Sequence, residues 1–99
     1  MAGGSAHLEE VRRIVLDGLG GYRANVYLFG SWAKGSASRV SDIDVAVMPL
    51  EPLPSGLLAG IRERLEESRV LHPVELVDLS RAGPEFRRRV EAEGIPWTV

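Results

Sequence analysis

Two acidic residues separated by one apolar residue are the clearest candidates for chemistry in this sequence. Asp42 and Asp44 flank Ile43 and open an apolar run that ends at Pro49. On a β-strand, alternate side chains share a face, with Cα atoms about 6.5–7 Å apart. Two carboxylates held so close repel each other and resist burial unless a cation lies between them. The Asp-Ile-Asp spacing therefore indicates a site for a divalent metal ion.

A glycine and a serine upstream of the acidic pair form a candidate phosphate site. Gly30-Ser31 directly follows the apolar run 24–29, where a strand is expected to turn. Glycine lets the backbone approach a phosphate closely, and serine adds a hydroxyl donor. Lys34, the only lysine, either reaches a phosphate or faces solvent, and Trp32 either stacks on a base or covers the turn. A phosphate site beside a dication site predicts a bound Mg²⁺–triphosphate.

The spacing of these two motifs resembles that of a known superfamily. Gly30-Ser31, ten further residues and then Asp42-Ile43-Asp44 is similar to the signature of the DNA polymerase beta-like nucleotidyltransferases. The fuller run Gly-Ser-x-Ala-x-Gly, followed by Ser-Asp-Ile-Asp, resembles the minimal nucleotidyltransferases (MNT), and the similarity covers nearly the whole chain. The resemblance implies an Mg²⁺-dependent antitoxin that transfers AMP from ATP to a tyrosine of a HEPN-domain toxin.

The superfamily requires a third carboxylate from a neighbouring strand, and this sequence offers two. Glu75 and Asp78 are three positions apart, so on a regular strand they face opposite sides. Glu75 is favoured because it comes early in its strand, as the family's third acid does. The resemblance therefore implies catalytic and metal-binding roles for Asp42, Asp44 and Glu75, and nucleotide-binding roles for Gly30, Ser31 and Lys34.

Two other functions stay open beside the protein adenylyltransferase. The first is an antitoxin that neutralises its toxin by binding alone, with an idle or decayed active site. Glu75 keeps this alternative open because many relatives carry Asp there, whereas the intact Gly-Ser and Asp-Ile-Asp motifs favour an enzyme. The second is transfer to a small molecule, which is disfavoured because the chain has no second domain to form an acceptor pocket.

The hydrophobic periodicity predicts the elements that must position these residues. Apolar residues at three- and four-residue spacing predict helices, and short β-branched runs predict strands. The order predicts an α/β fold, a small mixed β-sheet with helices packed on one face. The expected helices are 6–18, 56–69 with Ser55 as N-cap, and 84–93; the expected strands are 24–29, 42–48 and 74–79, with a helical turn at 32–35 and an edge strand at 95–99.

Composition narrows the class of protein further. Ninety-nine residues, 44% hydrophobic and 26% charged, suit a single globular domain over 1–99. The net charge of −2 argues against a general nucleic-acid binder, so nucleic acid is not expected as a direct partner. No cysteine is present, and no apolar run is long enough to span a membrane. With no signal peptide at its start, a cytoplasmic location is expected.

Overall fold

The computed structural model describes residues 3–37 and 41–98, which form a four-stranded mixed sheet with helices on both faces. The strand order is β3-β2-β1-β4; β1 is antiparallel to both β2 and β4, and β2 is parallel to β3. No helix in this part of the chain is long and apolar enough to cross a membrane. The elements are α1 (Gly3–Leu19), β1 (Ala24–Phe29), α2 (Ser31–Lys34), β2 (Ile43–Pro49), α3 (Leu57–Glu66), β3 (Val74–Asp78), the 3-10 turn η1 (Leu79–Arg81), α4 (Pro84–Glu93) and β4 (Ile95–Pro96).

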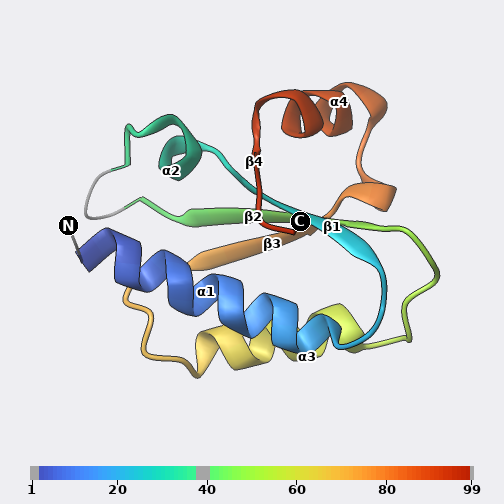
Figure 1. The fold of residues 1–99 in the computed structure, drawn as a ribbon, viewed down its shortest axis with the longest axis horizontal. Helices are drawn as coiled ribbons and strands as arrows, with labels where there is room; N and C mark the ends of the chain where they lie inside the picture. The colour runs from blue at the N-terminus through green and yellow to red at the C-terminus, as the bar shows by residue number, and fades with distance from the viewer. Residues whose placement is uncertain (1–2, 38–40, 99) are drawn as a thin grey trace.

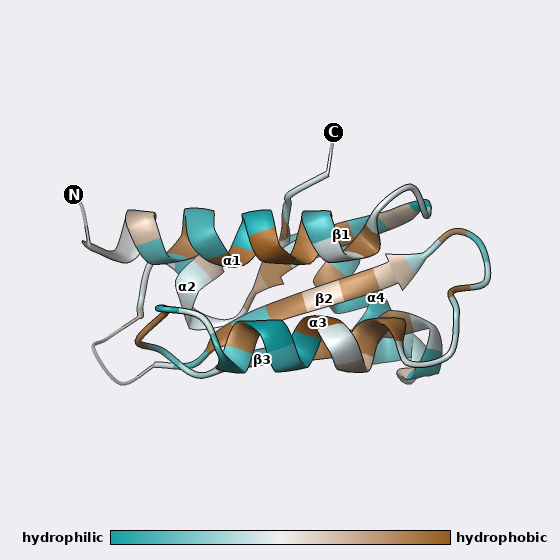
Figure 2. Cartoon of the chain, turned by 90° about the horizontal axis from the view of Figure 1, so that it is seen from below, coloured by the Kyte–Doolittle hydropathy of each residue, from teal (hydrophilic) through white to brown (hydrophobic). Residues whose placement is uncertain are grey.

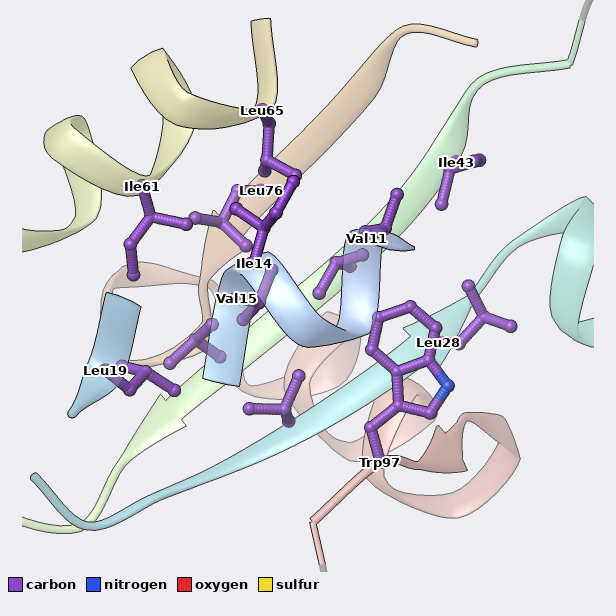
Figure 3. Packing of buried hydrophobic residues seen from close by; sticks show 13 residues of the cluster. Val11, Ile14, Val15, Leu19, Leu28, Ile43, Ile61, Leu65, Leu76 and Trp97 are labelled. Carbon is purple, nitrogen blue, oxygen red and sulfur yellow. The ribbon is translucent and has the colours of Figure 1, made fainter. Parts of the chain in front are cut away.

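The main core lies between the sheet and the helix pair α1 and α3. Alternate residues of β1 and β2 point to this side and are almost fully buried, as the period of two requires. The two helices lie side by side beneath the sheet in Figure 1, and β2 is visible between them in Figure 2. Figure 3 shows how their apolar side chains meet those of the strands. The cluster comprises Val11, Ile14, Val15, Leu19, Val26, Leu28, Ile43, Val45, Val47, Ile61, Leu65, Leu76 and Trp97.

The mixed sheet is confirmed, but the placement of every helix on one face is wrong. α4 lies on the side of the sheet opposite α1 and α3 (Figure 1). There Val90 joins a second core cluster with Ala46 and Leu79, and Tyr27 and Phe29 pack against it. These strand positions alternate with those of the main core, so the sheet is apolar on both faces over this region. An exposed apolar face would be costly in water, and α4 covers it.

Several element boundaries also differ from the sequence predictions. The expected N-cap at Ser55 is wrong: α3 begins at Leu57, and its N-cap is Gly56, with φ 86° and no side-chain cap. The helix ends at Glu66 instead of position 69, because the Ser68 hydroxyl donates to the Leu65 carbonyl and tightens the turn. The predicted bounds of β1 and α4 are confirmed. The predicted edge strand is present but shorter than expected, because β4 covers residues 95–96 and the prediction covered 95–99.

Candidate active site

Two of the three proposed acids lie side by side on neighbouring strands. Asp44 of β2 is paired in parallel register with Glu75 of β3, so both side chains leave the same face of the sheet. Asp42 lies one residue before β2 begins and is exposed, as Glu75 is, whereas Asp44 is half-buried. This is the face on which α4 packs, but the acids lie near the N-terminal ends of β2 and β3. One face of the sheet is therefore acidic at one end and apolar at the other.

The acids are close enough to influence one another's ionisation. Burial raises the pKa of Asp44, and the negative charges of Glu75 and Asp42 raise this pKa further. A set of carboxylate oxygens that repel one another suits a hard divalent cation such as Mg²⁺ or Mn²⁺. Within residues 3–37 and 41–98, however, no three His, Asp or Glu side chains converge tightly enough to hold a metal ion. The chemistry of the donors fits the ion, and metal binding would require the carboxylates to rotate toward one another.

Gly30 places the candidate phosphate site directly against the acids. It follows the last residue of β1, and its backbone has φ 77° and ψ −155°, a region that is essentially restricted to glycine. A Cβ atom added at this position would overlap the Asp44 Oδ2 atom. A ligand resting on the 30–31 turn can therefore reach the Asp44 carboxylate, because no side chain separates them.

The short helix α2 begins immediately after this glycine. The backbone N–H groups of Ala33 and Lys34 donate to the Gly30 carbonyl, which closes the first turn. The N–H groups of Ser31 and Trp32 precede this pattern and have no partner within the helix. Ser31 is half-buried and Lys34 is exposed at the last position of the helix. The turn thus presents backbone donors, a hydroxyl group and an ammonium group within four residues.

The sequence left two roles open for Trp32, which were stacking on a base and covering the turn. Its indole Nε1–H donates to the Ser41 carbonyl at 3.3 Å. Its ring lies edge-to-face on His72, with ring centroids 5.0 Å apart. The indole therefore covers the turn and links α2 to the segment that leads into Asp42. In the sequence, this role of Trp32 is indicated only by a large aromatic residue between two small ones.

Asp78, the alternative third acid, is engaged elsewhere. Its carboxylate accepts hydrogen bonds from the Ser80 backbone N–H at 2.9 Å and from the Ser80 hydroxyl at 2.6 Å, and so caps η1. It lies beside Val47 in the β2–β3 register, three positions along the strand from Glu75. The structure therefore brings Glu75, and not Asp78, beside Asp44.

One large hollow in the described part of the chain is not at the acids. It has a volume of about 730 Å³ and lies at the opposite end of β2, where the loop after Pro49 passes Arg62 and Arg81. Neither the acidic pair nor the 30–31 turn lines it. The location of an active site depends on convergent chemical groups as well as on volume, so the acidic end of the sheet is the better candidate.

The sequence matches the family model described as polymerase beta, nucleotidyltransferase, over residues 24–96. This range contains the 30–31 turn, all three acids and all of α4. The chain belongs to the polymerase beta nucleotidyltransferase family.

Individual relatives agree with this family assignment. The chain is 35% identical over 69 residues to the protein adenylyltransferase MntA of Shewanella oneidensis, a match covering 70% of this chain and 49% of that protein. The chain spans about half the length of the curated relatives it matches. A solved structure described as a minimal nucleotidyltransferase is 31% identical, with a TM-score of 0.72 and coverage of 90% and 91% of the two chains. A toxin-antitoxin crystal structure with AMP-PNP is 27% identical, with a TM-score of 0.68 over 88% and 72%.

Proposed function

We propose that the chain transfers AMP from ATP to a tyrosine hydroxyl of a HEPN-domain toxin and thereby acts as an antitoxin. One observation carries the proposal: Gly30 abuts Asp44, and Asp44 is in register with Glu75. A triphosphate on the 30–31 turn would therefore lie beside the acids. The name of the Shewanella relative, protein adenylyltransferase, supports AMP transfer. The toxin-antitoxin structure with AMP-PNP supports ATP as the nucleotide and a toxin as the partner.

The acids and the 30–31 turn have separate tasks in the proposed site. When bound, Mg²⁺ held by Asp42, Asp44 and Glu75 would supply positive charge to the phosphates and the departing pyrophosphate. Gly30 leaves room for a phosphate, and the Ser31 hydroxyl and the adjoining backbone N–H groups donate to its oxygens. In the transfer the tyrosine hydroxyl releases its proton to solvent and its oxygen bonds to the α-phosphorus. The bond from that phosphorus to the bridging oxygen breaks, and pyrophosphate leaves.

The double variant Asp42→Asn, Asp44→Asn tests this activity. Toxin co-expressed with the wild-type chain should carry AMP on tyrosine, as shown by intact-mass and peptide mass spectrometry. Toxin co-expressed with the double variant should carry none, because neutral amides are poor ligands for a hard dication. Circular dichroism and thermal unfolding should show that the variant is folded. Modification that persists in a folded double variant would disprove the proposed roles of the two acids.

Neutralisation by binding alone is the second candidate function. It is favoured by the geometry of the acids, which do not converge on a common point in the described part of the chain. Cell growth in the presence of toxin separates the two candidates. An enzyme requires its acids for protection, whereas a binder protects equally well with Asn at positions 42 and 44.

A further inference from the structure

A second hollow, of about 180 Å³, lies beside Gly30, between α2 and α4. One wall is formed by Gly30, Ala33 and Lys34 at the turn and α2, and the opposite wall by residues of α4. Phe29 of β1 and Phe86 of α4 also line it, with their rings edge-to-face at a centroid distance of 5.6 Å. Gly30 lines the hollow and also lies against Asp44, so the hollow adjoins the proposed site at this residue.

The charged residues around this hollow favour an anion. Lys34 approaches from α2 and Arg89 from α4, and both side chains are exposed. Among the residues that the structure describes, neither cation forms an ion pair. Glu93 is the one acid among the lining residues, so two positive charges face one negative charge.

We propose that this hollow receives the terminal phosphates of the nucleoside triphosphate, and that Arg89 is a nucleotide-binding residue opposite Lys34. The inference rests on the proposed function, which places the triphosphate at the 30–31 turn. Pockets that enclose drug-sized ligands occupy about 300–1,000 Å³. A hollow of about 180 Å³ holds only part of a nucleotide. The phosphate end of the nucleotide is the part that matches Lys34 and Arg89, two cations that form no ion pair among the described residues.

The position of Arg89 on α4 gives the proposal a structural consequence. A guanidinium group donates two parallel hydrogen bonds to phosphate oxygens, which an ammonium group cannot do. A nucleotide held between Lys34 and Arg89 would connect α2 to α4, elements that flank the same hollow. α4 would then have two roles: it would cover the apolar end of this face of the sheet, and it would complete the nucleotide site. Glu93 would oppose phosphate binding by electrostatic repulsion.

Calorimetric titration of the full chain with Mg²⁺ and AMP-PNP, ADP or AMP tests the inference. Arg89→Ala should weaken AMP-PNP binding about 10–100-fold, the value of charge-assisted hydrogen bonds, and should affect AMP much less. Arg88→Ala is the matched control, since Arg88 is the neighbouring exposed arginine and does not line the hollow. Arg89→Lys should restore part of the affinity. Glu93→Gln should tighten AMP-PNP binding because it removes the negative charge.

The possible outcomes separate this inference from the proposed function. If the wild-type chain binds AMP-PNP and a folded Arg89→Ala variant binds it equally well, the inference is overturned and the proposed function stands. If Arg89→Ala weakens all three nucleotides equally, or if Glu93→Gln weakens binding, the hollow holds the base and the inference is also overturned. If the wild-type chain binds none of the nucleotides, both proposals fail.

Discussion

Gly30 occupies a backbone conformation that other residues rarely adopt, and Asp44 fills the space where its side chain would be. Gly35, at the other end of α2, also has a positive φ of 75°, but its ψ of 15° lies in the left-handed helical region. No atom lies within 4 Å of a Cβ added at Gly35, whereas one added at Gly30 overlaps the Asp44 carboxylate. The two glycines at the ends of α2 therefore differ both in backbone region and in the space around them.

Gly35→Ala should destabilise the fold by about 1–2 kcal/mol, the usual cost of the left-handed conformation. Gly30→Ala should cost more, because its backbone strain of about 1–3 kcal/mol adds to the displacement of Asp44. Gly30→Ala should also abolish nucleotide binding, whereas Gly35→Ala should leave binding largely intact. Urea unfolding and nucleotide titration of both variants measure these effects. Equal losses of stability and affinity would show that Asp44 does not need the space at Gly30.

The raised pKa of Asp44 predicts an unusual dependence of stability on pH in the absence of metal. The folded chain binds the Asp44 proton more tightly than the unfolded chain does, so stability falls as pH rises through the pKa of the folded state. At neutral pH in EDTA, Asp44→Asn should therefore unfold at a higher temperature than the wild type. The difference should shrink as the pH falls and Asp44 becomes protonated.

Two controls accompany this measurement. Glu66→Gln removes an exposed carboxylate on α3, which covers the opposite face of the sheet, and should leave the unfolding temperature nearly unchanged. Added Mg²⁺ should stabilise the wild-type chain and not Asp44→Asn. A lower unfolding temperature for Asp44→Asn at neutral pH would show that the carboxylate is stabilised in the folded chain, contrary to the direction of the pKa shift.

The sequence alone indicated the local part of the candidate site and not its long-range contacts. The turn at Gly30 and the acids at Asp42 and Asp44 were identifiable because their spacing lies within a single stretch of chain. Glu75 could be favoured over Asp78 only by strand position, since the parallel register that pairs Glu75 with Asp44 is a property of the folded sheet. The proposed role of Arg89 could not be predicted, because it depends on where α4 packs.

At the scale of elements, the contact between α1 and α3 depends on a glycine inside α1. Gly18 lies in the last turn of that helix, and a Cβ added there would overlap Ile61 Cγ1 on α3. The helix continues past Gly18 to Leu19 and ends where Gly20 has a φ of 60°. Gly60, within α3, has no atom within 4 Å of an added Cβ. The absence of a side chain is therefore needed for packing at Gly18 and not at Gly60.

Gly18→Ala and Gly60→Ala should change stability in opposite directions. Replacing a glycine in an exposed helix interior by alanine stabilises by about 0.5–1 kcal/mol, which is the expectation for Gly60→Ala. Gly18→Ala should destabilise by about 1–3 kcal/mol, because Ile61 must move in a packed core. Guanidinium unfolding curves of the two variants provide the measurement. Stabilisation by both substitutions would show that α1 and α3 can separate at no cost.

The position of α4 shows which element-level information the sequence does and does not contain. Its bounds were predictable because Pro84 suits the first turn and Gly94 stops the helix. The face of the sheet on which α4 packs was not predictable, because the strand pattern predicted only one buried side for each strand. Tyr27 and Phe29 on β1, and Met48 on β2, do signal a second apolar face once the register is known.

At the scale of the whole molecule, the last residues of the chain connect the sheet to the first helix. The Trp97 carbonyl accepts hydrogen bonds from the Arg12 guanidinium of α1 at 3.1 and 3.3 Å. The Trp97 N–H donates to the Val26 carbonyl at 2.7 Å, and the Val26 N–H donates to the Thr98 hydroxyl. Trp97 is 8% exposed and packs into the main core. The C-terminal segment therefore stabilises the face of the sheet opposite the acids.

Trp97→Ala should accordingly lower global stability while leaving the chemistry of the site unchanged in molecules that remain folded. Truncation of a buried aromatic residue costs about 3–5 kcal/mol, a large part of the roughly 5–15 kcal/mol that stabilises a typical domain. Ile95→Ala is the control, because Ile95 lies on the adjacent β4 and is 43% exposed. Thermal unfolding should show a much larger loss for Trp97→Ala, while nucleotide affinity measured well below the unfolding temperature should match the wild type. Weaker nucleotide binding at a temperature where the variant is fully folded would instead mean that the two faces of the sheet are coupled, and that the helix pair beneath the sheet helps to position Asp44.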